Sequence, residues 1–242
     1  MISGSESECA SWRPRSSGVI YGAWAAAGRS ALTSRPATPR RLARALGGQL
    51  PARGQRIGLL GGSFNPAHGG HLTISEAALK RLRLDAVWWL VTPQNPLKPK
   101  TGMAPLADRL AGARAVIQGR PRVRATAIEA DLGTLYTLDT LRALTRRFPG
   151  VRFVWLMGAD NLVQIDRWAG WPQIFHSVPV AVFDRPNYSL RASAAKAAQR
   201  FRRARVRECN SGQLADQEPP AWVFLHATRD PRSATEIRAQ RR

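Results

Sequence analysis

Two histidines three residues apart, His68 and His71, follow a glycine pair and offer the chemistry of phosphate binding. They close the run G-G-S-F-N-P-A-H-G-G-H, which begins at Gly61 and also supplies a hydroxyl at Ser63. Imidazole N–H groups donate to phosphate oxygens, and residues three apart on the first turn of a helix share one face. The spacing therefore predicts that both imidazoles can donate to one phosphate group.

The segments on either side of this loop predict a strand before it and a helix after it. An apolar run over residues 57–60 ends at Gly61, and apolar side chains recur at helical spacing after the histidines. A helix N-terminus attracts anions, because its first N–H groups are unpaired and the macrodipole is positive there. A P-loop is excluded, since Pro66 and Ala67 stand where Gly-Lys would fall, and the dinucleotide fingerprint is excluded because Ser63 and Pro66 replace its glycines.

The remaining apolar runs predict a doubly wound, mostly parallel sheet of the Rossmann-like α/β class. Further strands are expected at residues 86–92, 122–128, 151–157, 177–184 and 221–226. Runs that are apolar on both faces are typical of parallel strands covered by helices, and strands alternate here with helical patterns. Helices are expected at 105–118, at 137–148 with Thr137 as N-cap, through the basic segment 189–207 and near the C-terminus, with a polar loop at 208–220.

Ligands of open α/β sheets bind at the carboxyl ends of the strands, and polar or aromatic residues follow several predicted strands here. Lys98 lies in the loop after the second strand, on the same expected edge as His68. Asp160 follows the fourth strand and is either a helix N-cap or a ligand contact. Trp168 and Trp171 come next, and such rings either pack in a core or stack on a pyridine or purine ring.

The composition limits the class of protein and of partner. The chain has 242 residues and a net charge of +21, which alone would favour a nucleic acid or another polyanion as partner. The loop from Gly61 to His71 carries no Lys or Arg, nearly all the basic residues are arginine, and RNA-recognition signatures are absent, so we do not expect nucleic acid. Cys9 and Cys209 have no metal-binding spacing, and no apolar run approaches the ~18 residues of a membrane span.

Two regions hold much of the basic charge. Residues 1–55 carry eight arginines against two glutamates, and residues 185–207 carry eight basic residues and no acid. We expect 1–55 to be a low-complexity extension without fixed structure and 56–242 to form one domain in the cytoplasm. The oligomeric state stays open.

The loop resembles the H-x-G-H signature of a nucleotidyltransferase superfamily, whose members join a nucleoside triphosphate to a phosphorylated acceptor and release pyrophosphate. Four more blocks narrow the resemblance to the bacterial nicotinate-nucleotide adenylyltransferases. They are Y-T-L-D-T-L, M-G-A-D-N-L followed by W-A-G-W, F-D-R-P-N-Y, and S-A-T-E-I-R. The similarity runs from Arg56 to about Arg238, with departures at Asn65, Arg232 and Ala234.

This resemblance implies adenylyl transfer from ATP, accompanied by Mg²⁺, to nicotinate mononucleotide in NAD biosynthesis. It implies catalytic roles for His68, His71 and Arg238. The implied ATP-binding residues are Gly61, Gly62, Ser63, Phe64, His68, His71, Asp160, Ser233, Thr235 and Arg238. The implied residues for nicotinate mononucleotide are Asn65, Lys98, Thr137, Asp160, Trp168 and Arg185.

Two alternatives stay open. The acceptor could be another phosphorylated compound, such as nicotinamide mononucleotide or phosphopantetheine. The chain could also be a nucleotide- or RNA-binding module without chemistry, which would release no pyrophosphate.

Overall fold

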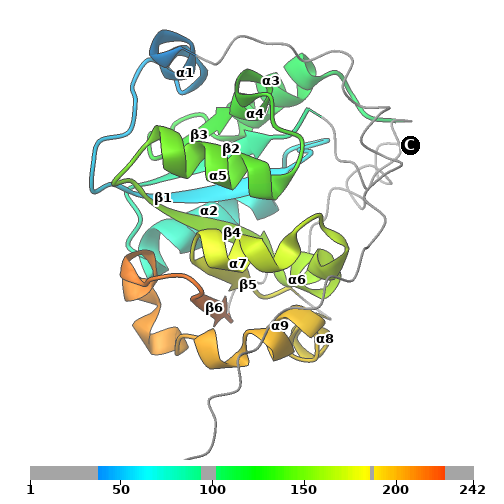
Figure 1. Ribbon diagram of the computed structural model, residues 1–242. Helices are drawn as coiled ribbons and strands as arrows, with labels where there is room; N and C mark the ends of the chain where they lie inside the picture. Colours follow the sequence, from blue (N-terminus) through cyan, green and yellow to red (C-terminus); the bar gives the residue numbers. More distant parts are fainter. Residues whose placement is uncertain (1–37, 94–101, 186–187, 227–242) are drawn as a thin grey trace, which may run out of the picture. The chain divides into compact units, whose positions relative to one another are not determined.

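The structure is a computed structural model that describes residues 38–93, 102–185 and 188–226 (Figure 1). Four predicted site residues lie outside the described residues, namely Lys98, Ser233, Thr235 and Arg238. The helix expected near the C-terminus and residues 1–37 of the expected extension also lie outside them.

The described strands form one six-stranded sheet in which every neighbouring pair is parallel, in the order β3-β2-β1-β4-β5-β6. The strands are β1 (Arg56–Gly62), β2 (Ala86–Val91), β3 (Val123–Thr126), β4 (Arg152–Gly158), β5 (Val180–Phe183) and β6 (Trp222–Leu225). Strands β2 and β3 follow on one side of β1, and β4, β5 and β6 follow on its other side. The predicted doubly wound parallel sheet is therefore confirmed.

Side chains alternate between two buried cores, one on each face of the sheet. On β4, Phe153 and Trp155 enter one core, while Val154 and Leu156 enter the other. Both faces of each central strand are therefore buried, which explains the uninterrupted apolar runs in the sequence.

Helices cover both faces of the sheet; Figure 1 shows α5 in front of it and α2 behind it. The core that contains Trp155 is covered by α1 (Pro39–Ala45), α4 (Ile128–Leu132), α5 (Thr137–Arg147), α6 (Ala159–Gln164), η1 (Ile165–Arg167), α7 (Trp171–Ser177), α8 (Ser189–Ser193), α9 (Lys196–Arg200) and η2 (Arg202–Ala204). The core that contains Leu156 is covered by α2 (Gly69–Arg81), α3 (Leu106–Val116) and the 3₁₀ helix η3 (Glu208–Asp216).

Helix α1 corrects the prediction that the fold begins near Arg56. Leu42 and Leu46 are each 1% exposed and belong to the core on this face. Their spacing of four residues gives the short helix one apolar side, and Arg124 donates to the carbonyl of Leu46 at 3.2 Å. The arginine-rich composition of residues 1–55 concealed this small amphipathic unit.

Three other local predictions are corrected. The strand expected to reach residue 128 ends at Thr126, because its hydroxyl accepts the N–H of Ile128 and turns the chain into α4. The expected loop 208–220 contains η3, which buries Leu214 and Ala215. The basic segment 189–207 is divided among α8, α9 and η2. No helix among the described residues is long and apolar enough to cross a bilayer.

Candidate active site

The candidate site lies where the strand order reverses, at the carboxyl ends of β1 and β4. Such a point leaves a crevice in open α/β sheets, because the connections of the neighbouring strands leave in opposite directions. The chain leaves β1 at Gly62 and reaches α2 through the loop that ends at His68, while Gly158 ends β4 and Asp160 follows it. The fold thus places the histidine loop and the acidic residue at one edge.

His68 and His71 cap helix α2 reciprocally. His68 is the N-cap, and its Nδ1 accepts the backbone N–H of Gly70 at 3.1 Å. The Nδ1 of His71 accepts the backbone N–H of His68 at 3.2 Å, and the two ring centroids are 3.9 Å apart. The spacing of three residues therefore brings the two rings together, as the sequence predicts.

These capping bonds determine which ring nitrogen can donate. An Nδ1 that accepts an N–H carries no proton, so the proton of each neutral imidazole sits on Nε2. The pKa of His71 is lowered to about 3, chiefly by desolvation, then by the repulsion that a protonated His68 would exert and by the charge of Arg185. His71 is therefore a neutral Nε2–H donor near neutral pH.

The aromatic rings of Phe64 and Trp89 pack against the ring of His71. Phe64 is 2% exposed, its ring stacks on Trp89 at 5.1 Å between centroids, and His71 lies 4.7 Å from it. The Nε1 of Trp89 donates to the hydroxyl of Ser75 at 2.7 Å, which holds this indole against α2. Since the ring of Phe64 is buried, only its backbone can line a ligand site.

The glycine pair serves aromatic packing. A Cβ on Gly61 would lie 2.4 Å from the ring of Trp155, and a Cβ on Gly62 would lie 3.3 Å from the ring of Phe64. The implied contacts of Gly61 and Gly62 with ATP stay predictions. Trp155 also packs edge to face on the half-buried ring of Trp168, with the two ring centroids 6.4 Å apart. Trp155 therefore contacts both Trp168 and Gly61 of the histidine loop.

Asp160 and Arg185 form an ion pair at this edge, with Oδ1 and Nε 3.3 Å apart. A Cβ on Gly158 would lie 2.3 Å from that Oδ1 and 3.0 Å from that Nε, so the pair lies directly against the glycine. Gly158 is the N-cap of α6 and Asp160 is its second residue, which excludes Asp160 as the N-cap. Arg185 lies close enough to His71 for its charge to lower the pKa of that ring.

The first turn of α5 contains Thr137, which the resemblance implies as a contact of nicotinate mononucleotide. Tyr136 is the N-cap and Thr137 the first helical residue, so the predicted capping role of Thr137 is wrong. No side chain caps this helix, and its first N–H groups remain available to an anion.

A buried carboxylate that the sequence did not reveal supports this turn. Glu129 accepts the hydroxyl of Thr92 at 2.5 Å and that of Thr140 at 3.2 Å. The two threonines stand just after β2 and in the first turn of α5, so Glu129 connects these elements. Desolvation raises the pKa of Glu129.

Two side chains fasten the histidine loop to the segment before α3. Asn65, predicted to bind the mononucleotide, donates from Nδ2 to the carbonyl of Gly102 at 3.0 Å and accepts the N–H of Ala104 at 3.4 Å. Arg109, absent from the predicted set, donates to four backbone carbonyls around the loop. The sequence does indicate that Arg109 is buried, because it lies on the apolar face of the expected helix 105–118, beside Leu110.

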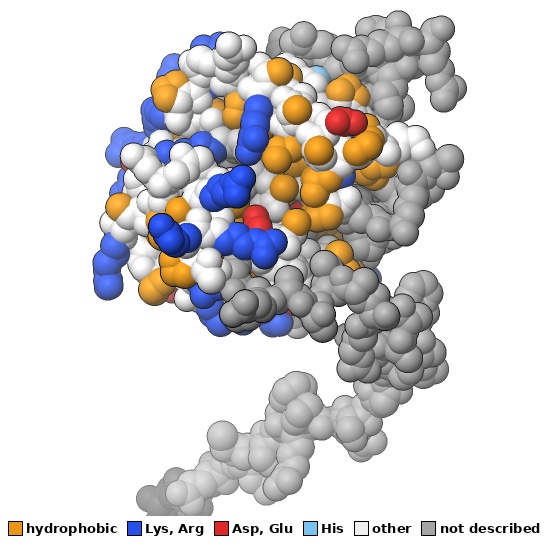
Figure 2. Space-filling view, turned by 90° about the horizontal axis from the view of Figure 1, so that it is seen from above, with side chains coloured by type: hydrophobic (Ala, Val, Ile, Leu, Met, Phe, Trp, Pro, Cys, Tyr) orange, Lys and Arg blue, Asp and Glu red, His pale blue; other side chains and the backbone are white. Residues whose placement is uncertain are grey.

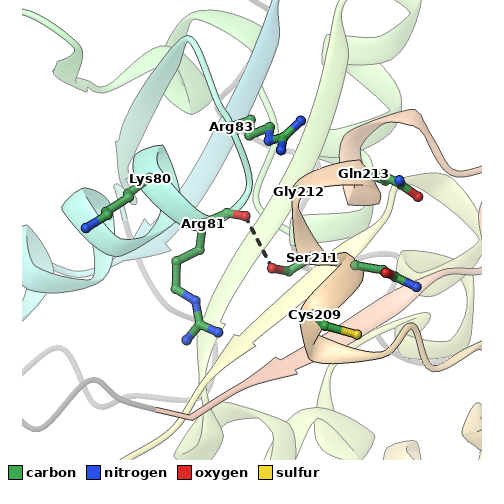
Figure 3. A pocket seen from close by; sticks show the side chains of 8 residues that line it. Lys80, Arg81, Arg83, Cys209, Ser211, Gly212 and Gln213 are labelled. Carbon is green, nitrogen blue, oxygen red and sulfur yellow. Dashed lines mark hydrogen bonds between the residues drawn. The ribbon is translucent and has the colours of Figure 1, made fainter.

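A cavity of about 270 Å³ lies elsewhere, between the C-terminal end of α2 and η3 (Figure 3). None of the predicted site residues lines it. Figure 3 shows Lys80 and Cys209 pointing in different directions, while Arg81 is paired with Glu208 at 2.7 Å. Its side chains therefore converge on no common point, and we assign it no part in the site.

Figure 2 shows Lys and Arg side chains in separate groups over one face of the molecule, beside a group of hydrophobic side chains. Within residues 38–93, 102–185 and 188–226, no group of three His, Cys, Asp or Glu side chains could hold a metal ion.

Comparison with known proteins gives the class first. The model of the cytidylyltransferase-like family matches residues 59–240, which include both histidines, Asp160, Trp168 and Arg185. The match covers more than half of the chain, and the chain belongs to this family.

Curated relatives then give the particular group. Two proteins named "Probable nicotinate-nucleotide adenylyltransferase", from Methylorubrum extorquens (strain PA1) and Bradyrhizobium sp. (strain ORS 278), are 53% and 52% identical to this chain. The alignments cover 76% of this chain in both cases, and 100% and 95% of the relatives. Within its class, the chain is therefore a member of the nicotinate-nucleotide adenylyltransferases.

Solved structures agree on the fold. Nicotinic acid mononucleotide adenylyltransferase from Plasmodium falciparum, complexed with NaAD, gives a TM-score of 0.58 at 14% identity, over 76% of this chain and 83% of that chain. The same enzyme complexed with APC gives 0.56 at 13% identity, over the same shares of the two chains.

Proposed function

We propose that this protein transfers the adenylyl group of ATP to nicotinate mononucleotide, giving nicotinate adenine dinucleotide and pyrophosphate. The observation that carries the proposal is the reciprocally capped histidine pair at the reversal of strand order. The membership of the family and the half-buried Trp168 near the same edge support it.

The phosphates of ATP would bind at the start of α2. There the Nε2–H groups of His68 and His71 add to the positive end of the α2 macrodipole, and both donors suit an anion. Mg²⁺ commonly keeps several waters and binds through substrate phosphates together with one or two carboxylates, so we propose that it enters as the MgATP complex. Ser233, Thr235 and Arg238 stay predicted phosphate contacts.

The mononucleotide would bind between Trp168 and the start of α5. The indole of Trp168 offers a flat surface for the pyridine ring. The uncapped N–H groups at Thr137 suit the nicotinate carboxylate, because the N-terminus of a helix favours negative charge. Arg185, held beside Asp160, would meet the 5′-phosphate of the acceptor.

The chemical step needs no side-chain base. An oxygen of the acceptor 5′-phosphate, already an anion at neutral pH, attacks the α-phosphorus of ATP in line. The new P–O bond forms as the bond from that phosphorus to the bridging oxygen of the β-phosphate breaks, and pyrophosphate leaves with the electron pair. Catalysis then depends on positioning and on neutralising the phosphate charge, which the two histidines, Arg238 and the loop N–H groups would share.

The test is a pyrophosphate-release assay with MgATP and, separately, nicotinate and nicotinamide mononucleotide. We expect turnover with both and a higher kcat/KM for the acid, because the α5 N-terminus recognises its carboxylate. A preference for the amide would overturn the choice of acceptor. ATP binding without any pyrophosphate release would instead favour a non-catalytic module.

A further inference from the structure

Arg109 is a buried cation whose partners are all backbone carbonyls. It is 4% exposed. Its Nε donates to Ala104 at 2.9 Å, its Nη1 to Ser63 at 2.7 Å and to Thr92 at 2.8 Å, and its Nη2 to Pro93 at 3.0 Å. Among the described residues it makes no ion pair. Burying a charge without a counter-ion is costly, so the neutral carbonyls must compensate for the lost water.

These four bonds join three separate segments of the chain. Ser63 belongs to the histidine loop, Thr92 and Pro93 follow β2, and Ala104 precedes α3. The planar guanidinium presents five N–H donors in fixed directions, so it can bind all three segments together. A single side chain therefore fastens the loop after β1 to the end of the neighbouring strand.

The bond to the Ser63 carbonyl also constrains the peptide group between Ser63 and Phe64. In a trans peptide the N–H points opposite to the preceding carbonyl, so fixing the Ser63 carbonyl also fixes the direction of the Phe64 N–H. Phe64 has a φ of +47°, in the left-handed region that residues with a side chain disfavour. Such a conformation persists only where its surroundings impose it. Arg109 on one side and the stacked Trp89 on the other supply that constraint.

We propose that Arg109 is a positioning residue for adenylyl transfer, which holds the Ser63–Phe64 peptide of the histidine loop in the conformation that receives the phosphates of ATP. The inference rests on the proposed function only where its test measures enzyme kinetics. It predicts that the shape of the guanidinium matters as well as its charge, because a lysine ammonium cannot reach carbonyls in three segments at once.

The experiment compares Arg109→Lys and Arg109→Met with Arg114→Met as the matched control. Arg114 lies on the same helix, is exposed and makes no ion pair with the described residues. For each variant we would measure the melting temperature, kcat, the KM of each substrate, and the affinity for inorganic pyrophosphate by calorimetry.

We expect R109K to fold, to lose about 10- to 100-fold in kcat, and to show a larger rise in the KM of ATP than in that of the mononucleotide. Its affinity for pyrophosphate should fall in parallel, and R114M should match the wild type. Wild-type kinetics in R109K would overturn the proposal, as would a loss of activity that only follows the folded fraction. If R109M does not fold, R109K alone decides.

Calorimetry separates this inference from the proposed function. Weaker pyrophosphate binding by R109K would support the positioning role even if the wild-type protein released no pyrophosphate from ATP. Unchanged binding in R109K would overturn it even if the wild type were fully active.

Discussion

The Nδ1 of His71 accepts the backbone N–H of His68 across 3.2 Å. This bond makes the second histidine a structural part of the helix cap as well as a candidate phosphate donor. It leaves Nε2 as the only donor of the ring, and desolvation keeps the ring neutral near neutral pH. Helix capping and the proposed phosphate recognition therefore depend on the same side chain.

Replacing His71 by alanine should reduce kcat by about 100- to 1000-fold, the usual loss when one donor to a transition-state oxyanion is removed. Steady-state pyrophosphate release measures this. The matched control is His176→Ala, since His176 is exposed on α7. Wild-type turnover in H71A would contradict the role of the ring.

The free energy of unfolding should fall as the pH falls from about 6.5 to about 3. The folded-state pKa of His71 is about 3 and its ordinary value is 6.5, so in this window the unfolded chain binds a proton that the folded protein does not. Above pH 6.5 the contribution of His71 to the free energy of unfolding does not change with pH. Between pH 6.5 and about 3 the free energy of unfolding falls by about 1.4 kcal/mol for each pH unit. Urea titrations of wild type and His71→Gln would check this. Identical slopes in the two proteins would show that His71 is not the group responsible.

Replacing Trp168 by alanine should raise the KM of nicotinate mononucleotide and leave that of ATP nearly unchanged. Stacking of an aromatic side chain on a base contributes about 1–3 kcal/mol, which corresponds to roughly 5- to 150-fold. Trp168→Phe should retain part of the effect. Because Trp168 also packs on Trp155, melting curves must accompany the kinetics. An effect confined to ATP would place the pyridine ring elsewhere.

Gly158→Ala should weaken binding of the mononucleotide about tenfold, since its Cβ would collide with Asp160 and displace Arg185. Loss of one charge-assisted hydrogen bond, about 1.5 kcal/mol, accounts for this size. Gly112→Ala is the control, because nothing lies within 4 Å of its Cβ and it sits inside α3. That variant should keep full activity and gain about 0.5–1 kcal/mol in stability. Equal KM values in G158A and wild type would argue against a role for the ion pair in binding.

Prediction from the sequence succeeded where the signal was local. The apolar runs and the strand-to-helix order predicted the parallel sheet. The spacing of His68 and His71 predicted that the two rings share one face, and their centroids are 3.9 Å apart. It failed for α1, where two leucines in an arginine-rich segment gave too short a pattern, and for Thr137, where Tyr136 is the N-cap. The predicted roles of positions outside the described residues, Arg238 among them, stay predictions.

By itself the sequence determined the order of the strands along the chain, the histidine spacing and the family, because these depend on neighbouring residues and on a linear pattern. Only the tertiary structure decided that Arg109 reaches Ser63, that Glu129 connects Thr92 to Thr140, and that Gly61 makes room for Trp155. The physical reason is that each of these contacts joins residues from different strands or loops. Their distance in space is set by the packing of the sheet and helices, which no local pattern records.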